Sequence, residues 1–428
     1  MSRFHLGSRP APAESVYLLI GALSTLAGTV MFTIATVFYV ERGGLNPFQL
    51  VLMGTVLETS VLVFEAPTGV LADTYSRRLS VIIGTFVLGA AFFVMGAWPT
   101  AGVLLGLQVV SGLGYTFQSG ALDAWLADEV GAENVGRIYL RSGQINRFVG
   151  LAGALISVGL ASLALRIPMV AGGLIYLALG CALLVIMPEA GFASRQSGES
   201  EPQGLKSMLA TFKEGLRLVR GRPVLTLLLV ASLLFGAASE GYDRLYQAHL
   251  LADFTFPALG ALQPIVWFGI LSAAAGLFTL AVVEIFRRRM EAASQSPALA
   301  ARVLLILNLG STACVIIFAL TGSFWLAVLT TLLRAALGGL IDPLYNAWLV
   351  QSIHPRVRAT VLSMVSQGNA LGQIVVGPGV GAIGSLISLR AAIATAGLLL
   401  APVSLLFGRA IRSGRLDSRV EVEAPAEA

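Results

Sequence analysis

Twelve apolar runs, each of roughly 20 residues or more, follow one another along this chain of 428 residues. A helix rises 1.5 Å per residue, so about 20 apolar residues cross the roughly 30 Å hydrocarbon core of a bilayer. Inside that core a helix satisfies all of its own backbone hydrogen bonds. The sequence therefore predicts an all-α membrane protein with twelve transmembrane helices, at 15–40, 47–72, 79–98, 101–126, 138–165, 168–187, 223–241, 262–286, 301–320, 324–350, 359–385 and 389–408.

Composition agrees with a lipid environment and argues against several other classes. Charged residues make up 12% of the chain, about half the share in soluble domains. The net charge of +5 comes from short loops between apolar runs, which argues against a nucleic-acid partner. Both cysteines, Cys181 and Cys314, lie within apolar runs, and no metal-ligand spacing or catalytic arrangement is present. We expect no enzyme, metal or cofactor, and we expect ion or substrate gradients to drive any transport.

A polar stretch divides the twelve runs into six and six. We predict an N-terminal six-helix bundle at 1–188, a cytoplasmic linker at 189–222, a C-terminal six-helix bundle at 223–410 and a cytoplasmic tail at 411–428. Within the linker, apolar residues from Leu205 to Val219 recur at spacings of three and four with basic residues between them. That pattern indicates an amphipathic helix at the membrane surface.

Basic residues predict the orientation. With both termini in the cytoplasm, about 22 of the 28 Lys and Arg residues fall on the cytoplasmic side. The predicted outer loops keep only Arg42, Arg166, Arg244 and Arg390. The strong preference for Arg over Lys is typical of GC-rich bacterial genomes. We expect a multi-pass protein of the bacterial inner membrane.

An internal repeat relates the two halves. The tetrapeptides that begin at Asp123 and Asn346 share the letters Ala-Trp-Leu, and each is followed by a Gln and an Asn in the next run. Every pair keeps an offset of 223 residues, as in Gln144 with Gln367 and Asn146 with Asn369. Such a repeat predicts two homologous bundles with a binding site where they meet.

The loop between the second and third runs carries a motif. It reads Gly-Val-Leu-Ala-Asp-Thr-Tyr-Ser-Arg-Arg from Gly69 to Arg78 and resembles the signature loop of the major facilitator superfamily. The resemblance implies two six-helix bundles, alternating access, and a gate loop in which Gly69, Asp73, Arg77 and Arg78 act. Residues 64–78 and 240–244 also look like those of bacterial drug exporters. Gln108 departs from the Arg of proton-coupled members, and the antiporter motif expected in the fifth run lacks its Pro.

Charged residues within the runs are candidates for function, because such groups are costly in lipid. Glu58 is the main candidate for a proton- or cation-coupling carboxylate, although it could instead pair with a buried Arg. Glu65 lies two turns further on the same face and could brace the gate loop. Asp123 is a third candidate, and the resemblance favours its pairing with Arg77.

Two arginines and several amides are candidates for the substrate cavity. Arg147 and Arg334 lie near mid-depth and could pair with Glu58 or contact an anionic substrate. The amides could line the site or hold helices together; they are Gln144, Asn146, Asn346, Gln367 and Asn369. At the outer end of the seventh run, the spacing of Glu240 and Arg244 predicts an ion pair. With Asp243 this pair could form an outer latch.

The leading functional hypothesis is proton-driven efflux of amphipathic small molecules, such as drugs or metabolites, by an antiporter. Two alternatives stay open. One is uptake or facilitated transport of a specific polar or anionic solute, and the other is transport of lipid. The resemblance implies that the protein acts as a monomer.

Overall fold

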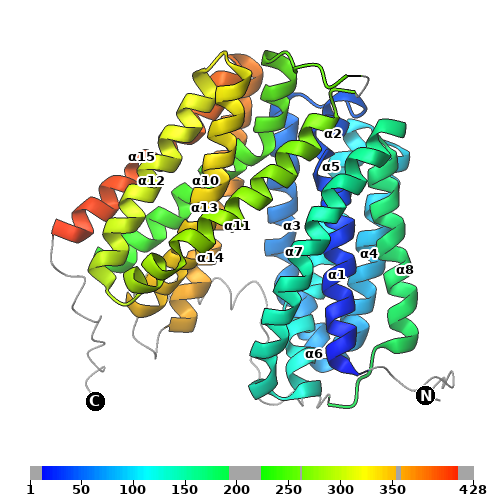
Figure 1. Ribbon diagram of the computed structural model, residues 1–428. Coiled ribbons are helices and arrows are strands. Elements are labelled where there is room, and N and C mark those ends of the chain that lie inside the picture. Colours follow the sequence, from blue (N-terminus) through cyan, green and yellow to red (C-terminus); the bar gives the residue numbers. More distant parts are fainter. Residues whose placement is uncertain (1–11, 192–222, 261–262, 353–357, 413–428) are drawn as a thin grey trace, which may run out of the picture. The chain divides into compact units, whose positions relative to one another are not determined.

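The computed structural model describes residues 12–191, 223–260, 263–352 and 358–412, and each regular element in them is a helix (Figure 1). The helices are α1 (Ala13–Phe32), α2 (Ala35–Glu41), α3 (Pro47–Thr74), α4 (Arg77–Ala97), α5 (Ala101–Gln118), α6 (Ala121–Val130), α7 (Ala132–Leu163), α8 (Ile167–Ile186), α10 (Pro223–Asp253), α11 (Val266–Ser294), α12 (Pro297–Leu320), α13 (Phe324–Ser352), α14 (Arg358–Leu386) and α15 (Leu389–Arg412).

Each of the twelve predicted spans coincides with one helix or one broken helix. Helices α1 and α2 together form the first span, and α5 and α6 together form the fourth. Among the helices described, nine are long and apolar enough to cross a membrane by length and composition. The amphipathic helix predicted near 205–219 lies outside the described residues.

The chain groups into two compact units. Unit 1 consists of residues 1–45, 56–208 and 257–273, and unit 2 of residues 46–55, 209–256 and 274–428. The first residues of α3 therefore belong with α10 to α15, and the first residues of α11 belong with α1 to α8. The bundle limits predicted from sequence stay a prediction.

The same pattern of helix packing recurs in both units. In unit 1, α1 packs on α7 and α8, and α4 packs on α5 and α8. In unit 2, α10 packs on α14 and α15, and α12 packs on α13 and α15. A shift of 223 residues maps the first four pairs onto the second four. The internal repeat is thus a repeat of packing as well as of sequence.

The repeated tetrapeptide explains part of this correspondence. Trp125 and Leu126 are buried in the core of unit 1, and Trp348 and Leu349 are buried in the core of unit 2. Burying a large aromatic ring and a leucine removes several hundred Å² of apolar surface from solvent or lipid. Each unit therefore needs both residues at the same point of its packing.

The fourth span is interrupted, and its repeat partner, which stays one helix, has a proline at the corresponding place. Unit 1 breaks the helix between α5 and α6, where Gly120 has φ +67°, a conformation that favours glycine. In unit 2 the residue 223 positions later is Pro343, inside α13. Proline lacks the N–H that would bond the carbonyl of Gly339, so α13 loses one helical hydrogen bond there.

Candidate functional site

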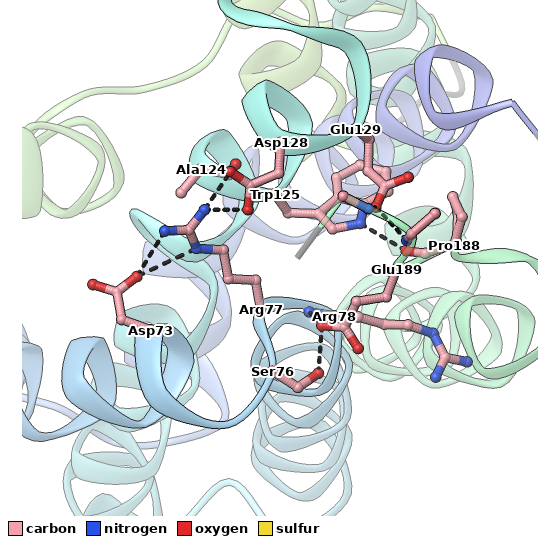
Figure 2. Close-up of polar contacts among 12 residues, drawn as sticks. Asp73, Ser76, Arg77, Arg78, Ala124, Trp125, Asp128, Glu129, Pro188 and Glu189 are labelled. Atoms are coloured by element: carbon pink, nitrogen blue, oxygen red, sulfur yellow. Dashed lines mark hydrogen bonds and ion pairs between the residues drawn. The ribbon is translucent and has the colours of Figure 1, made fainter. Parts of the chain in front are cut away.

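The gate loop joins α3 to α4 and is organised around Arg77 (Figure 2). The Arg77 guanidinium donates to Asp73 Oδ1 from Nη2 at 3.0 Å and from Nε at 3.3 Å. It also forms an ion pair with Asp128 of α6 and donates to the backbone oxygen of Ala124 at 3.3 Å. The Arg77 side chain is only 16% exposed. Charge-assisted bonds to two helices therefore fix the loop against α6.

The partner of Arg77 on α6 differs from the one expected. The sequence favoured Asp123, but that side chain is exposed and accepts a 3.3 Å hydrogen bond from the Tyr17 hydroxyl of α1. Ala124 and Asp128 are four residues apart and share the helix face that meets Arg77. Asp123 is five residues from Asp128, about 140° around the helix, and so it faces α1 instead.

A second set of contacts ties the chain after α8 to the gate loop, and sequence reasoning missed it. Glu189 Oε1 accepts from Ser76 Oγ at 2.6 Å and from the backbone N–H of Arg78 at 3.1 Å (Figure 2). Ser76 is the N-cap of α4 and accepts from the N–H of Leu79. A carboxylate at a helix N-terminus is favourable. The signal in the sequence was an acidic residue directly after the sixth span.

The same segment is also held by α6. Trp125 Nε1 donates to the backbone oxygen of Pro188 at 2.8 Å. Glu129 Oε1 accepts from the N–H groups of Ala190 and Gly191 at 2.7 and 2.8 Å. The buried Trp of the repeated tetrapeptide thus holds the chain after α8 as well as packing in the core of unit 1.

Unit 1 keeps charged side chains within its spans. Glu58 is the twelfth residue of α3 and is half-buried, and Glu65, two turns further, is exposed. Arg147 is the sixteenth residue of the 32-residue helix α7. It is exposed and makes no ion pair or hydrogen bond with any residue that the structure describes. Gly69 of the gate loop borders open space, because a Cβ atom at that position would meet nothing within 4 Å.

Unit 2 places Arg334 of α13 over an aromatic ring of α10. The guanidinium carbon lies 4.2 Å from the centroid of Tyr242, which stacks in turn on Tyr246 at 5.5 Å. Arg334 Nη2 is 3.6 Å from Asp243 Oδ1, and its Nε is buried without a hydrogen-bond partner. Arg334 is therefore held by charge and by its ring contact, with none of its five N–H donors bonded to a described residue.

The residues predicted to form an outer latch make two separate ion pairs. Glu240, only 4% exposed, pairs with Arg244 at 2.8 Å, which is the ion pair expected from their spacing. Asp243 instead pairs with Arg334. Gly54 of α3 lies against the Glu240 carboxylate, where a Cβ atom would overlap it. Any latch role for these residues stays a prediction.

Two of the four paired amides lie between helices. Asn146 donates to Ser142 of its own helix at 3.3 Å, and both side chains press on Gly21 of α1. Asn369 donates to the backbone oxygen of Ser232 of α10 at 3.4 Å. This geometry favours a packing role for this repeated pair.

The other amides are more open. Gln144 and Asn346 are exposed, and the half-buried Gln367 has one long 3.5 Å bond to Ser363. Among the described residues, no group of three or more His, Cys, Asp or Glu residues could hold a metal ion.

Comparisons with known proteins agree with this architecture. A protein of Bacillus subtilis (strain 168), described as the uncharacterized MFS-type transporter YxaM, is 24% identical over 395 residues, or 91% of this chain and 94% of the relative. The crystal structure of the nucleoside transporter NupG matches with TM-score 0.71 and 14% identity, over 94% of this chain and 99% of that one. A bacterial homologue of the human lysosomal transporter Spinster matches with TM-score 0.70 and 16% identity, over 95% and 98%.

At these identities the solved structures show the fold alone, and that fold confirms twelve transmembrane helices in two six-helix bundles. A family model described as the Major Facilitator Superfamily matches residues 17–301, well over half of the sequence. The protein is thus a multi-pass membrane transporter for small molecules and not an enzyme, and its chain belongs to the Major Facilitator Superfamily.

Proposed function

We propose that the protein is a proton-coupled exporter of amphipathic small molecules that works by alternating access as a single chain. The observation that carries the proposal is the presence of charged side chains at mid-depth in helices that span the membrane. Glu58 and Arg147 are both at least partly exposed there. Charged groups at that depth face water or a partner rather than lipid. A water-filled path for a solute, with a carboxylate beside it, accounts for both.

In this proposal Glu58 exchanges the proton, and the gate loop holds the cytoplasmic side. Arg77 links Asp73 of α3 to Asp128 of α6, and such a link is made and broken as a gate closes and opens. The outward direction of transport is supported by the resemblance of residues 64–78 and 240–244 to drug exporters. The placement in a bacterial inner membrane is supported by the bias of basic residues.

The test is transport into and out of proteoliposomes under an imposed pH gradient, with a panel of cationic dyes and antibiotics. We expect wild-type protein to move at least one of them and Glu58→Gln to abolish the dependence on the gradient. Glu291→Gln, an exposed carboxylate at the end of α11, is the matched control. Gradient-driven transport that survives Glu58→Gln would remove Glu58 from the mechanism and leave export standing.

A second candidate is transport of a specific anionic solute. It is favoured by the finding that Arg147 and Arg334 make no hydrogen bond with any described residue, which leaves their donors available to an anion. Counterflow of organic anions that Arg147→Gln or Arg334→Gln reduces at least tenfold would favour it over export of cations. If folded protein moved neither dyes nor anions but moved fluorescent phospholipid between leaflets, transport of lipid would replace both.

A further inference from the structure

One stripe of α13 is open and polar. Arg334, Gly338, Asp342 and Asn346 follow at intervals of four residues and so share one side of the helix. Asp342 and Asn346 are exposed, and a Cβ at Gly338 would meet nothing within 4 Å. Charged and amide side chains on a spanning helix avoid lipid. This stripe is therefore an unpacked, polar side of α13.

Asp342 is the least satisfied charge of the stripe. It forms no hydrogen bond or ion pair with any residue described, although it lies within electrostatic range of Arg334 and Asp243. The other acids of the neighbouring helices are engaged. Asp243 pairs with Arg334, Glu240 with Arg244, and Glu284 of α11 with Arg287.

The charges around Asp342 do not balance. Arg334 contributes one positive charge, and Asp243 and Asp342 contribute two negative ones when both are ionised. Arg334 is more buried than Asp243: 21% of the Arg334 side chain is exposed, against 58% of the Asp243 side chain. Tyr242 lies beneath the guanidinium and is 5% exposed. The exposed side thus presents mainly carboxylate.

We propose that the stripe Arg334–Gly338–Asp342–Asn346 is a binding face, at which Asp342 takes up one positive charge: a proton, or the ammonium group of the transported molecule. Arg334 and Asp243 hold each other and leave Asp342 to the ligand. A proton and an organic cation would compete for this carboxylate, so that Asp342 would release the cation as it takes up a proton, beside the coupling at Glu58. The inference rests on the proposed function, since it assigns the substrate of that transporter a cationic group.

The remaining titratable groups near this face are Tyr242 and Tyr246 of α10 and Cys314 of α12. None of them carries a charge near neutral pH in its ordinary state. A change in charge at the stripe is therefore assigned to Asp342.

The test measures the electrostatic potential at the stripe with a single cysteine. Gly338→Cys is made in a chain whose Cys181 and Cys314 are replaced by Ala. The reagents are two water-soluble methanethiosulfonates, one carrying trimethylammonium and one carrying sulfonate. At pH 8 we expect the cationic reagent to react faster, and Asp342→Asn to lower the ratio of the two rates about tenfold. Arg334→Gln should raise the ratio.

Two further conditions separate the proton from the organic cation. Lowering the pH to 5 should protonate Asp342 and bring the ratio of the two labelling rates to the value found for Asp342→Asn. The ratio is used because ionisation of the cysteine thiol changes both labelling rates equally. Ethidium at pH 8 should slow labelling if the site also takes an organic cation. A pH effect without protection by ethidium would assign the site to the proton.

The control is Ile317→Cys on α12, where the side chain is 43% exposed and apolar and the positions four residues away, Ala313 and Thr321, carry no charge. Failure of both reagents to label Gly338→Cys, as expected for Ile317→Cys, would place the stripe in lipid and overturn the proposal. A ratio that Asp342→Asn does not change would also overturn it. Labelling needs no transport, so a protein that exports nothing can still support this inference, and an active exporter can refute it.

Discussion

Gly54 is the residue at which α3 approaches a buried charge. A methyl group there would overlap the Glu240 carboxylate and separate it from Arg244. Because Glu240 is only 4% exposed, moving its carboxylate away from Arg244 weakens the pairing of a buried charge. We expect Gly54→Ala to lower the free energy of unfolding by about 3 kcal/mol, measured by thermal denaturation in detergent.

Gly69→Ala is the matched control for that prediction. It lies in the same helix, and a Cβ there meets nothing within 4 Å. Alanine is the better helix former by about 1 kcal/mol, so this variant should be neutral or slightly more stable. If Gly54→Ala and Gly69→Ala lost the same stability, an added methyl group anywhere in α3 would explain the loss. The clash with the Glu240 carboxylate would then not be its cause.

Asp123 and Asp128 are two carboxylates of the same helix with different partners. Asp128 pairs with Arg77, whose side chain is 16% exposed, whereas Asp123 is exposed and accepts a 3.3 Å bond from the Tyr17 hydroxyl. We expect Asp128→Asn to cost about 1–2 kcal/mol and Asp123→Asn less than about 0.5 kcal/mol in detergent denaturation. A larger loss for Asp123→Asn would restore the pairing first expected from the sequence.

Pairs within one helix could be predicted from the sequence, and pairs between helices could not. The ion pair of Glu240 with Arg244 follows from a spacing of four residues. The partner of Arg77 depends on how α6 is rotated against the loop, which no spacing within a segment specifies. Asp342 was missed for a similar reason, because only the structure, through the open space at Gly338, shows which side of α13 is unpacked.

At the scale of elements, the start of α3 is fixed by polar contacts within unit 2. Asn46 and Gln49 form a reciprocal capping pair at 2.9 and 3.1 Å. Ser385 Oγ of α14 accepts from the N–H of Phe48 at 2.8 Å. A helix N-terminus leaves unpaired N–H groups, and here a second helix supplies an acceptor.

We expect Ser385→Ala to destabilise this start by about 1 kcal/mol and to speed hydrogen exchange in the first turn of α3. Ser388→Ala is the control, since Ser388 caps the neighbouring helix α15 through the N–H of Ala391. It should speed exchange in α15 and leave α3 unchanged. The comparison is made by mass spectrometry of peptides from both helices; faster exchange in α15 alone after Ser385→Ala would contradict the assignment.

Helix positions were predictable because lipid imposes a strong length requirement on apolar segments. The interruptions were not predicted. The backbone turn at Gly120 depends on a positive φ that hydropathy does not record, and the first span divides into α1 and α2 without any polar gap in the sequence. Both breaks lie within continuous apolar runs, where composition gives no boundary.

At the scale of the whole molecule, the two units share packing but not charge. The residues 223 positions before Arg334 and Asp342 are Ser111 and Ser119, so unit 1 lacks these charges on its corresponding helix. The repeat preserves what each bundle needs to pack, such as Trp125 and Trp348. Function is therefore expected where the halves differ, which is at the unmatched charged residues.

The orientation of the whole chain is the last prediction, and it rests on basic residues alone. With alkaline phosphatase fused after Trp98, between α4 and α5, we expect activity, since that enzyme matures outside the cytoplasm. Fused after Arg78, between α3 and α4, it should be inactive, and green fluorescent protein at the C-terminus should fluoresce. The opposite pattern would put the gate loop outside. It would also contradict the orientation predicted from about 22 basic residues on the cytoplasmic side against four on the outer side, and helix packing within each unit gives no other indication of orientation.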